Sequence, residues 1–150
     1  MNLKDKINED LKAAMKEKDA LKLQTIRSIR ALILEFEKSG IGRELAPEDE
    51  LKMLSQAAKK RQESIEQFRN AGRNELADKE EAELKIIQTY LPKQLTEEEI
   101  EAEVKKLALQ VGASSKNDFA KLMPLAAKEM KGRADGKTIK TIVEKVLGGN

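Results

Sequence analysis

The chain has 150 residues, of which 29 are Lys or Arg and 27 are Asp or Glu, so its formal net charge is only +2. A protein that coats nucleic acid over its whole surface carries a stronger bias, so any nucleic-acid site here has to be local. Cysteine and histidine are both absent, which excludes disulfides, thiolate nucleophiles, zinc sites of the Cys/His type and acid–base catalysis by histidine.

The first part of the chain shows apolar residues three or four positions apart, which predicts four helices. They cover about residues 2–18 and 19–39, a stretch from Pro47 to a stop at Gly72, and about residues 74–90. Asp19 is a plausible N-cap for the second helix, and Pro47 suits the first turn of the third. The longest apolar run, residues 31–34, is far too short to span a bilayer. With no signal-peptide pattern at residues 1–18, we expect a soluble cytoplasmic protein without a membrane partner.

Pro92 is the clearest boundary, and three further helices are expected after it. The first begins at Thr96, where Glu99 completes a capping box, and ends at Gly112. The second runs to Gly132 and contains Pro124, which should kink or split it. The third covers about residues 135–147, and no strand pattern is present. The sequence therefore predicts an all-α protein with an N-terminal four-helix array, residues 1–92, and a C-terminal three-helix bundle, residues 93–150.

The stretch Gly132 to Thr138, GRADGKT, looks at first like a phosphate-binding loop of a nucleotide-hydrolysing enzyme. That loop has four residues between its glycines and follows a β-strand, whereas here there are three residues and a preceding helix. Gly132 is better explained as a glycine that ends a helix, and Asp135 as the N-cap of the next one. We therefore expect a helix–helix junction here, with no nucleotide cofactor.

Basic residues gather around this junction. Residues 116–145 contain eight Lys or Arg and four Asp or Glu, whereas the helix that begins after Thr96 is acidic in its first turns. Because a helix N-terminus already favours anions, the junction is a candidate nucleic-acid-binding site formed by Lys131, Arg133, Lys137 and Lys140. Lysines on polar helix faces are also commonly just solvated, so the pattern alone leaves both interpretations open.

A charged residue interrupts the apolar stripe of the third helix, because position 61 is Arg. The fourth helix has a matching interruption at Glu80 and Glu83. If the two helices form an antiparallel hairpin across Gly72, Arg61 faces Glu80 or Glu83, and a bidentate pair would satisfy both groups. Paired carboxylates also occur in acid–base and metal sites, but no further ligands cluster with them. We therefore predict a structural ion pair and no catalytic or metal-binding residue.

Several motifs resemble the GatB/YqeY family over nearly the whole chain. They are Arg61-x-x-Ser64-Ile65, Ala71-Gly72-Arg73-Asn74-Glu75-Leu76, Glu80-x-x-Glu83-Leu84, Tyr90-Leu91-Pro92 and Lys131-Gly132-Arg133-Ala134-Asp135-Gly136. The resemblance is to the stand-alone, YqeY-like type, and it implies a helical N-terminal array followed by a three-helix bundle. The same module forms the tail of the B subunit of the tRNA-dependent Glu/Asp amidotransferase, a carbon–nitrogen ligase with glutamine as amido-N-donor, where it contacts tRNA.

The resemblance implies a binding role, and the residues needed for the amidotransferase chemistry have no counterpart in the sequence. We therefore expect a non-catalytic accessory protein whose partner is tRNA or another structured RNA. The alternatives are a helical adaptor that docks a protein partner in tRNA amidation and an independent amidotransferase. An apolar surface between the fifth and seventh helices would favour the adaptor, and a pocket with convergent polar groups would favour the enzyme.

Overall fold

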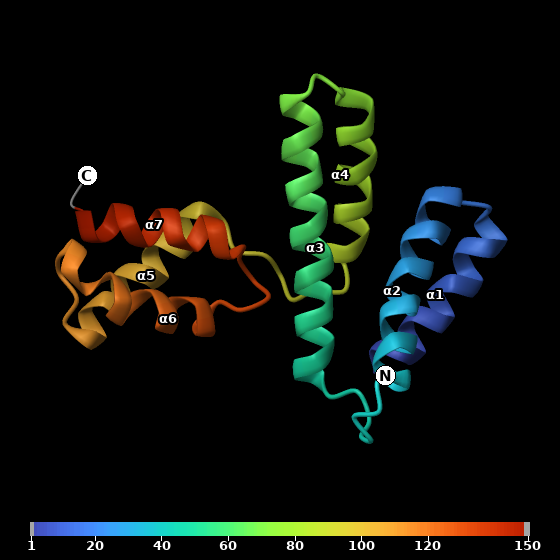
Figure 1. Ribbon diagram of the computed structural model, residues 1–150, viewed down its shortest axis with the longest axis horizontal. Helices are drawn as coiled ribbons and strands as arrows, with labels where there is room; N and C mark the ends of the chain where they lie inside the picture. The colour runs from blue at the N-terminus through green and yellow to red at the C-terminus, as the bar shows by residue number, and fades with distance from the viewer. Residues whose placement is uncertain (1, 149–150) are drawn as a thin grey trace. The chain divides into compact units, whose positions relative to one another are not determined.

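A computed structural model describes residues 2–148, and within this range the chain is entirely helical, with no strand. Contacts between Cα atoms divide the chain into two compact units, residues 1–92 and 93–150. Figure 1 shows their helices, which are α1 (Leu3–Glu17), α2 (Ala20–Lys38), α3 (Pro47–Asn70) and α4 (Asn74–Gln88), then α5 (Glu97–Val111), the 3-10 helix η1 (Lys116–Asp118), α6 (Phe119–Glu129) and α7 (Gly136–Gly148). The all-α prediction is confirmed.

The helix boundaries follow local chemistry. The Asp19 carboxylate accepts a hydrogen bond from the backbone N–H of Lys22 at 3.1 Å, and Pro47 occupies the first turn of α3. Thr96 and Glu99 form the predicted capping box, in which each side chain accepts a hydrogen bond from the other residue's backbone N–H. At the other end of α5, Gly112 adopts φ +69°, a left-handed conformation in which glycine costs least. Pro124 lies inside α6, which continues through it without splitting.

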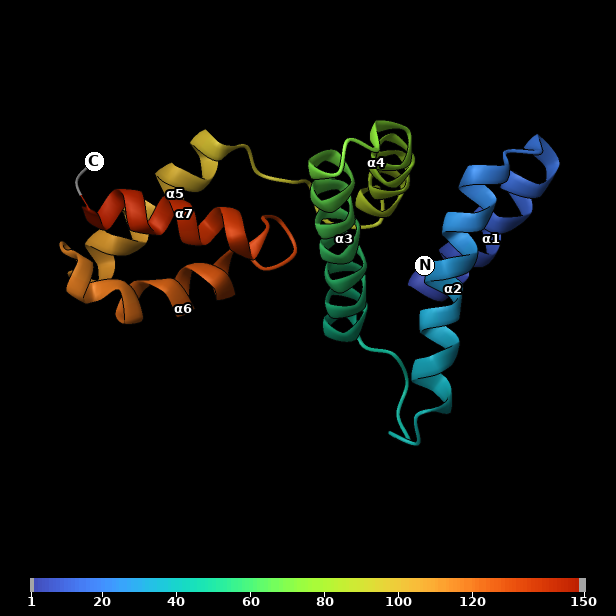
Figure 2. The same ribbon diagram turned by 45° about the horizontal axis from the view of Figure 1, so that its top comes forward.

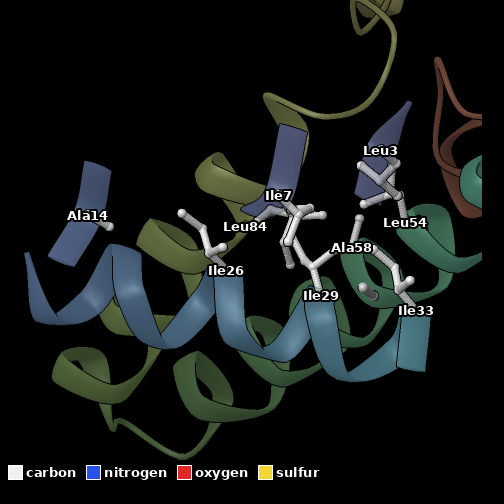
Figure 3. Packing of buried hydrophobic residues seen from close by; sticks show 11 residues of the cluster. Leu3, Ile7, Ala14, Ile26, Ile29, Ile33, Leu54, Ala58 and Leu84 are labelled. Carbon is white, nitrogen blue, oxygen red and sulfur yellow. The ribbon is translucent and has the colours of Figure 1, made fainter. Parts of the chain in front are cut away.

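The N-terminal unit consists of two helical hairpins, α1–α2 and α3–α4, each with its helices side by side in both ribbon views (Figures 1 and 2). The hairpins join mainly where α2 meets α4. Figure 3 shows the core at this contact, to which α2 contributes Ile26, Ile29 and Ile33. Helix α1 is also tied to the chain beyond α4, because the Tyr90 hydroxyl donates to the Asp10 carboxylate at 2.6 Å.

The C-terminal unit is a three-helix bundle in which α5, α6 and α7 all contact one another. Its core is drawn from one face of each helix, and the residues that are fully buried include Val104, Leu122, Met130 and Val143. Met130 follows the last residue of α6 and Ile139 lies in the first turns of α7, so two buried side chains flank the turn between these helices. This packing fixes where the turn lies on the surface of the bundle.

Candidate nucleic-acid interface

The turn between α6 and α7, residues 130–135, carries the first of the predicted phosphate contacts. Gly132 adopts φ +79°, and the backbone N–H groups of Arg133 and Ala134 both donate to the Met130 carbonyl, at 2.9 and 3.1 Å. α7 then begins at Gly136, directly after Asp135. The residues that resembled a phosphate-binding loop therefore form a helix–turn–helix junction with no adjoining strand in residues 2–148.

Two hydrogen bonds from the segment before α5 hold the backbone of this turn. The backbone N–H of Leu95 donates to the Arg133 carbonyl at 2.8 Å, and the Gln94 side-chain amide donates to the Gly132 carbonyl at 2.8 Å. A turn whose carbonyls are fixed in this way loses little entropy on binding. The segment before α5 therefore holds in place the backbone that carries Lys131 and Arg133.

The four predicted contact residues differ in their surroundings. Lys131, Lys137 and Lys140 are exposed, whereas Arg133 is half-buried. The Arg133 guanidinium donates to the Glu129 carbonyl at 2.8 Å, which holds it against the end of α6. Lys137 lines the groove between α5 and α7. Lys131 and Lys140 are therefore the members of the set that the structure leaves most open to a ligand.

The groove beside Lys137 runs between α5 and α7 and has a volume of about 400 Å³. Its lining consists of Glu97, Glu98, Glu101, Lys137, Thr138, Thr141, Ile142 and Lys145. The Glu101 carboxylate lies 3.4 Å from Lys145 Nζ and 3.7 Å from Lys105 Nζ. On this side of the bundle, the carboxylates of α5 thus face the basic residues of α7, so the local field for a phosphate is weak.

The buried ion pair lies in the N-terminal unit. Arg61 Nε is 3.9 Å from Glu83 Oε2, and the two side chains are only 16% and 9% exposed. This distance is too long for a hydrogen bond, and Arg61 Nε has no hydrogen-bond partner in the described residues. The Arg61 guanidinium also donates to the Ser28 hydroxyl at 3.3 Å, which connects α3 to α2. The contact between Arg61 and Glu83 is therefore looser than the predicted bidentate pair, in which two hydrogen bonds would join the guanidinium to the carboxylate.

The pKa of Glu83 is raised above its ordinary value, first because burial disfavours the charged carboxylate and second because Glu80 is close by. Arg61 acts in the opposite direction but does not cancel these effects. Glu80 forms no ion pair with Arg61 among the described residues, so the structure brings Arg61 to Glu83 and leaves Glu80 beside them. Sequence periodicity missed Ser28, because nothing in α2 signals which of its hydroxyls will face α3.

No group of three or more acidic side chains within residues 2–148 is arranged to hold a metal ion. No helix in the same range is long and apolar enough to cross a membrane. What the arrangement offers is a rigid basic turn in one unit and a charged contact inside the other.

The sequence of this chain is similar to that of a known protein family. A family model described as "Yqey-like protein" matches residues 4–147. Three similar curated proteins all carry the name "Altered inheritance of mitochondria protein 41, mitochondrial". The protein from Pyrenophora tritici-repentis is 33% identical over 147 residues, which is 95% of this chain and 80% of the relative. The one from Saccharomyces cerevisiae (strain YJM789) is 34% identical, over 88% of this chain and 70% of the relative. The one from Lachancea thermotolerans is 33% identical, over 73% of this chain and 59% of the relative.

Proposed function

The chain belongs to the YqeY-like family, and on that premise we propose that it is a non-catalytic accessory protein that binds structured RNA, most specifically tRNA, through the basic end of its C-terminal bundle. The observation that carries the proposal is the α6–α7 turn, where exposed Lys131 and Lys140 flank a backbone held by hydrogen bonds from Gln94 and Leu95. The resemblance to the tRNA-contacting tail of the amidotransferase B subunit supports the choice of tRNA.

Contacts of this kind position an RNA without reading its sequence, because lysine and arginine bind phosphates as charges. Lys131 and Lys140 would approach phosphates directly, with Lys137 beside them. Arg133 keeps one guanidinium nitrogen on the Glu129 carbonyl, and its other N–H groups can still donate to a phosphate. The proposal assigns no catalytic residue and no cofactor to this chain.

Salt-dependent binding of a tRNA transcript, followed by fluorescence anisotropy, tests the proposal. Four phosphate contacts predict a log–log salt slope of magnitude up to about 3.6, if each contact behaves as on duplex DNA. Replacing Lys131, Arg133, Lys137 and Lys140 together by alanine should lower the magnitude of the measured slope by up to about 3.6, the share of these four contacts. The matched control is Lys59→Ala with Lys60→Ala, two exposed lysines of α3, and it should bind as the wild type does. Affinity that ignores salt, or that survives the fourfold replacement, contradicts the proposal.

An apolar surface between α5 and α7 would favour the adaptor alternative. The groove found there is lined by carboxylates, lysines and threonines, with Ile142 as its single aliphatic residue, so it does not favour that alternative. Recovery of the tagged protein with and without RNase separates the two. RNA that co-purifies supports our proposal, whereas a protein partner that persists after RNase treatment supports the adaptor.

A cytoplasmic location is part of the proposal. The names of the curated relatives include the word "mitochondrial". Localisation of the tagged chain in its own cell therefore tests directly whether the chain is cytoplasmic or mitochondrial. The remaining alternative, an independent amidotransferase, predicts glutaminase activity of the purified chain, and we expect none.

A further inference from the structure

The outward face of α6 carries two lysines that the predicted site does not include. Lys121 and Lys128 are both exposed and lie seven residues apart, which is almost two helical turns, so they share one face at a separation of about 10 Å along the axis. The opposite face of the helix contributes Leu122 and Ala126 to the core. Because the core fixes the rotation of α6, these two lysines have to point away from the bundle.

Little obstructs a ligand between them. The other exposed residues of α6 are Ala120, Pro124 and Glu129, and the first two are too small to keep a rod-shaped molecule at a distance. Asp118 precedes the helix and lies near Lys121, but its carboxylate accepts hydrogen bonds from the backbone of Ser114 and Ser115 at 2.8 and 3.1 Å. That carboxylate is therefore held toward its own loop.

The two sides of the bundle differ in whether their lysines form ion pairs with carboxylates. On the α5 side, Lys105 and Lys145 both lie within 4 Å of the Glu101 carboxylate. On the α6 side, no ion pair among the described residues involves Lys121, Lys128, Lys131 or Lys140. Carboxylates within 4 Å therefore offset Lys105 and Lys145 but not these four lysines, which favours α6 and the turn over the surface around Glu101 for a phosphate chain.

The kind of RNA follows from what the surface lacks. Proteins that hold unpaired strands stack the bases on aromatic side chains. The C-terminal unit has one aromatic residue, Phe119, and it packs against the core. Lysines spaced along a straight helix suit the regular backbone of base-paired RNA, which proteins recognise through its phosphates and its shape.

We propose that the RNA-binding surface extends from Lys131 and Lys140 along α6 to Lys128 and Lys121, and that its ligand is the backbone of base-paired RNA. This inference rests on the proposed function and specifies the partner of that same site. It assigns Lys121 and Lys128 as contact residues and places the surface around Glu101, Lys105 and Lys145 away from the RNA.

The test uses the full chain and two probes, a blunt RNA duplex of about 16 base pairs and a U-rich strand of the same length that cannot pair. Anisotropy titrations between about 50 and 200 mM salt give affinity and salt slope for each probe. The variant is Lys121→Ala with Lys128→Ala, and the matched control is Lys105→Ala with Lys145→Ala on the α5 side. Lys121→Arg with Lys128→Arg keeps both charges, and thermal melts confirm that every variant folds.

We expect the duplex to bind more tightly than the unpaired strand. The α6 alanine variant should lower duplex affinity roughly tenfold and reduce the salt slope by about 2, since each phosphate contact contributes about 1. The arginine variant should bind as the wild type does. The α5-side control should change affinity by less than about twofold, because Glu101 lies within 4 Å of both lysines and offsets part of their attraction for phosphate.

Two results would overturn this inference and leave the proposed function standing. One is equal or tighter binding of the unpaired strand. The other is duplex binding that survives the α6 alanine variant but is lost when Lys131, Arg133, Lys137 and Lys140 are replaced by alanine. Binding of neither probe, nor of tRNA, would overturn the inference and the proposed function together.

Discussion

The two units of this protein use charge in opposite ways. The N-terminal unit buries Glu83, with Arg61 beside it, between helices of its core. In the C-terminal unit every fully buried side chain among the described residues is apolar, and the charges lie on the surface, with the acids of α5 gathered in its first turns and lysines outnumbering acids on α6 and α7. Charged side chains therefore take part in the core of the first unit and lie on the surface of the second.

Size helps to explain the difference. A buried ion pair has to recover the cost of removing two charges from water, and a small domain has few apolar contacts to offset any shortfall. The C-terminal unit, residues 93–150, is the smaller of the two. A purely apolar core is the safer arrangement for it, and its stability should therefore depend strongly on each large buried side chain.

The largest expected effect comes from Leu122→Ala in α6. Leu122 is fully buried, and its truncation leaves a cavity that typically costs about 3 to 4 kcal/mol. In so small a unit this loss should unfold the three-helix bundle first and separate one melting transition into two. Calorimetry or urea unfolding followed by circular dichroism measures this.

Leu109→Ala is the matched control for that change, because Leu109 lies on α5 and is 85% exposed. Its truncation should alter the unfolding free energy by less than about 0.5 kcal/mol. A single, barely shifted transition for Leu122→Ala would show that the C-terminal core is less critical than the comparison implies.

Arg61→Ala tests the buried charge of the N-terminal unit. The change removes the partner of Glu83 and the hydrogen bond to Ser28. Loss of one member of a buried pair costs about 3 kcal/mol or more, and we expect the lower end because Glu83 can take up a proton. Urea unfolding should report this loss, with Arg61→Lys retaining part of the stability. A midpoint that hardly moves would mean that the pair contributes nothing to the fold.

Gly112→Ala should have a smaller effect, of about 1 kcal/mol. Gly112 ends α5 at φ +69°, and a methyl group added there would meet no heavy atom within 4 Å, so the cost comes from the left-handed backbone alone. Gly136→Ala is the control, because Gly136 opens α7 in equally open space without a positive φ. That substitution should be neutral or slightly stabilising. Equal effects at the two glycines would contradict the backbone argument.

Glu83→Gln should have the smallest effect on stability, and this effect should depend on pH. The pKa of Glu83 in the folded protein lies above its ordinary value of 4.5, so the folded state binds this proton more tightly than the unfolded state does. The stability that Glu83 contributes is therefore complete below about pH 4.5 and is lost as the pH rises through the folded pKa. The unfolding free energy of the wild type should fall relative to that of the Gln variant over this interval. Unfolding free energies that change in parallel with pH in the two proteins would contradict this prediction.

Sequence reasoning predicted the helices and their caps well, because these depend on local spacing. Thr96 with Glu99, and Asp19, act within one helical turn, so their roles are visible in the order of residues alone. Pro124 does not split its helix. The helix passes through it, and the carbonyl of Ala120 that loses its donor belongs to an exposed residue that water can reach.

The candidate sites were harder to predict, because they depend on contacts between distant segments. Arg61 interrupting an apolar stripe indicated a partner on α4, but periodicity could not choose between Glu80 and Glu83, and it gave no sign of Ser28, which is 33 residues away. In the same way, the run of lysines in residues 116–145 does not reveal which of them meet α5. The carboxylate of Glu101 engages Lys145 across the bundle, and only the packing of α5 against α7 determines that.

The link between Gln94 and Gly132 has a sequence separation of 38, and together with the bond from Leu95 to Arg133 it closes a loop that contains α5 and α6. Bringing segments so far apart in the sequence together costs conformational entropy, which the packing of α5, α6 and α7 against one another has to offset. Proteolytic cleavage just before α5 should therefore loosen the 130–135 turn while leaving each helix intact, and it should weaken the RNA binding that we propose for that turn.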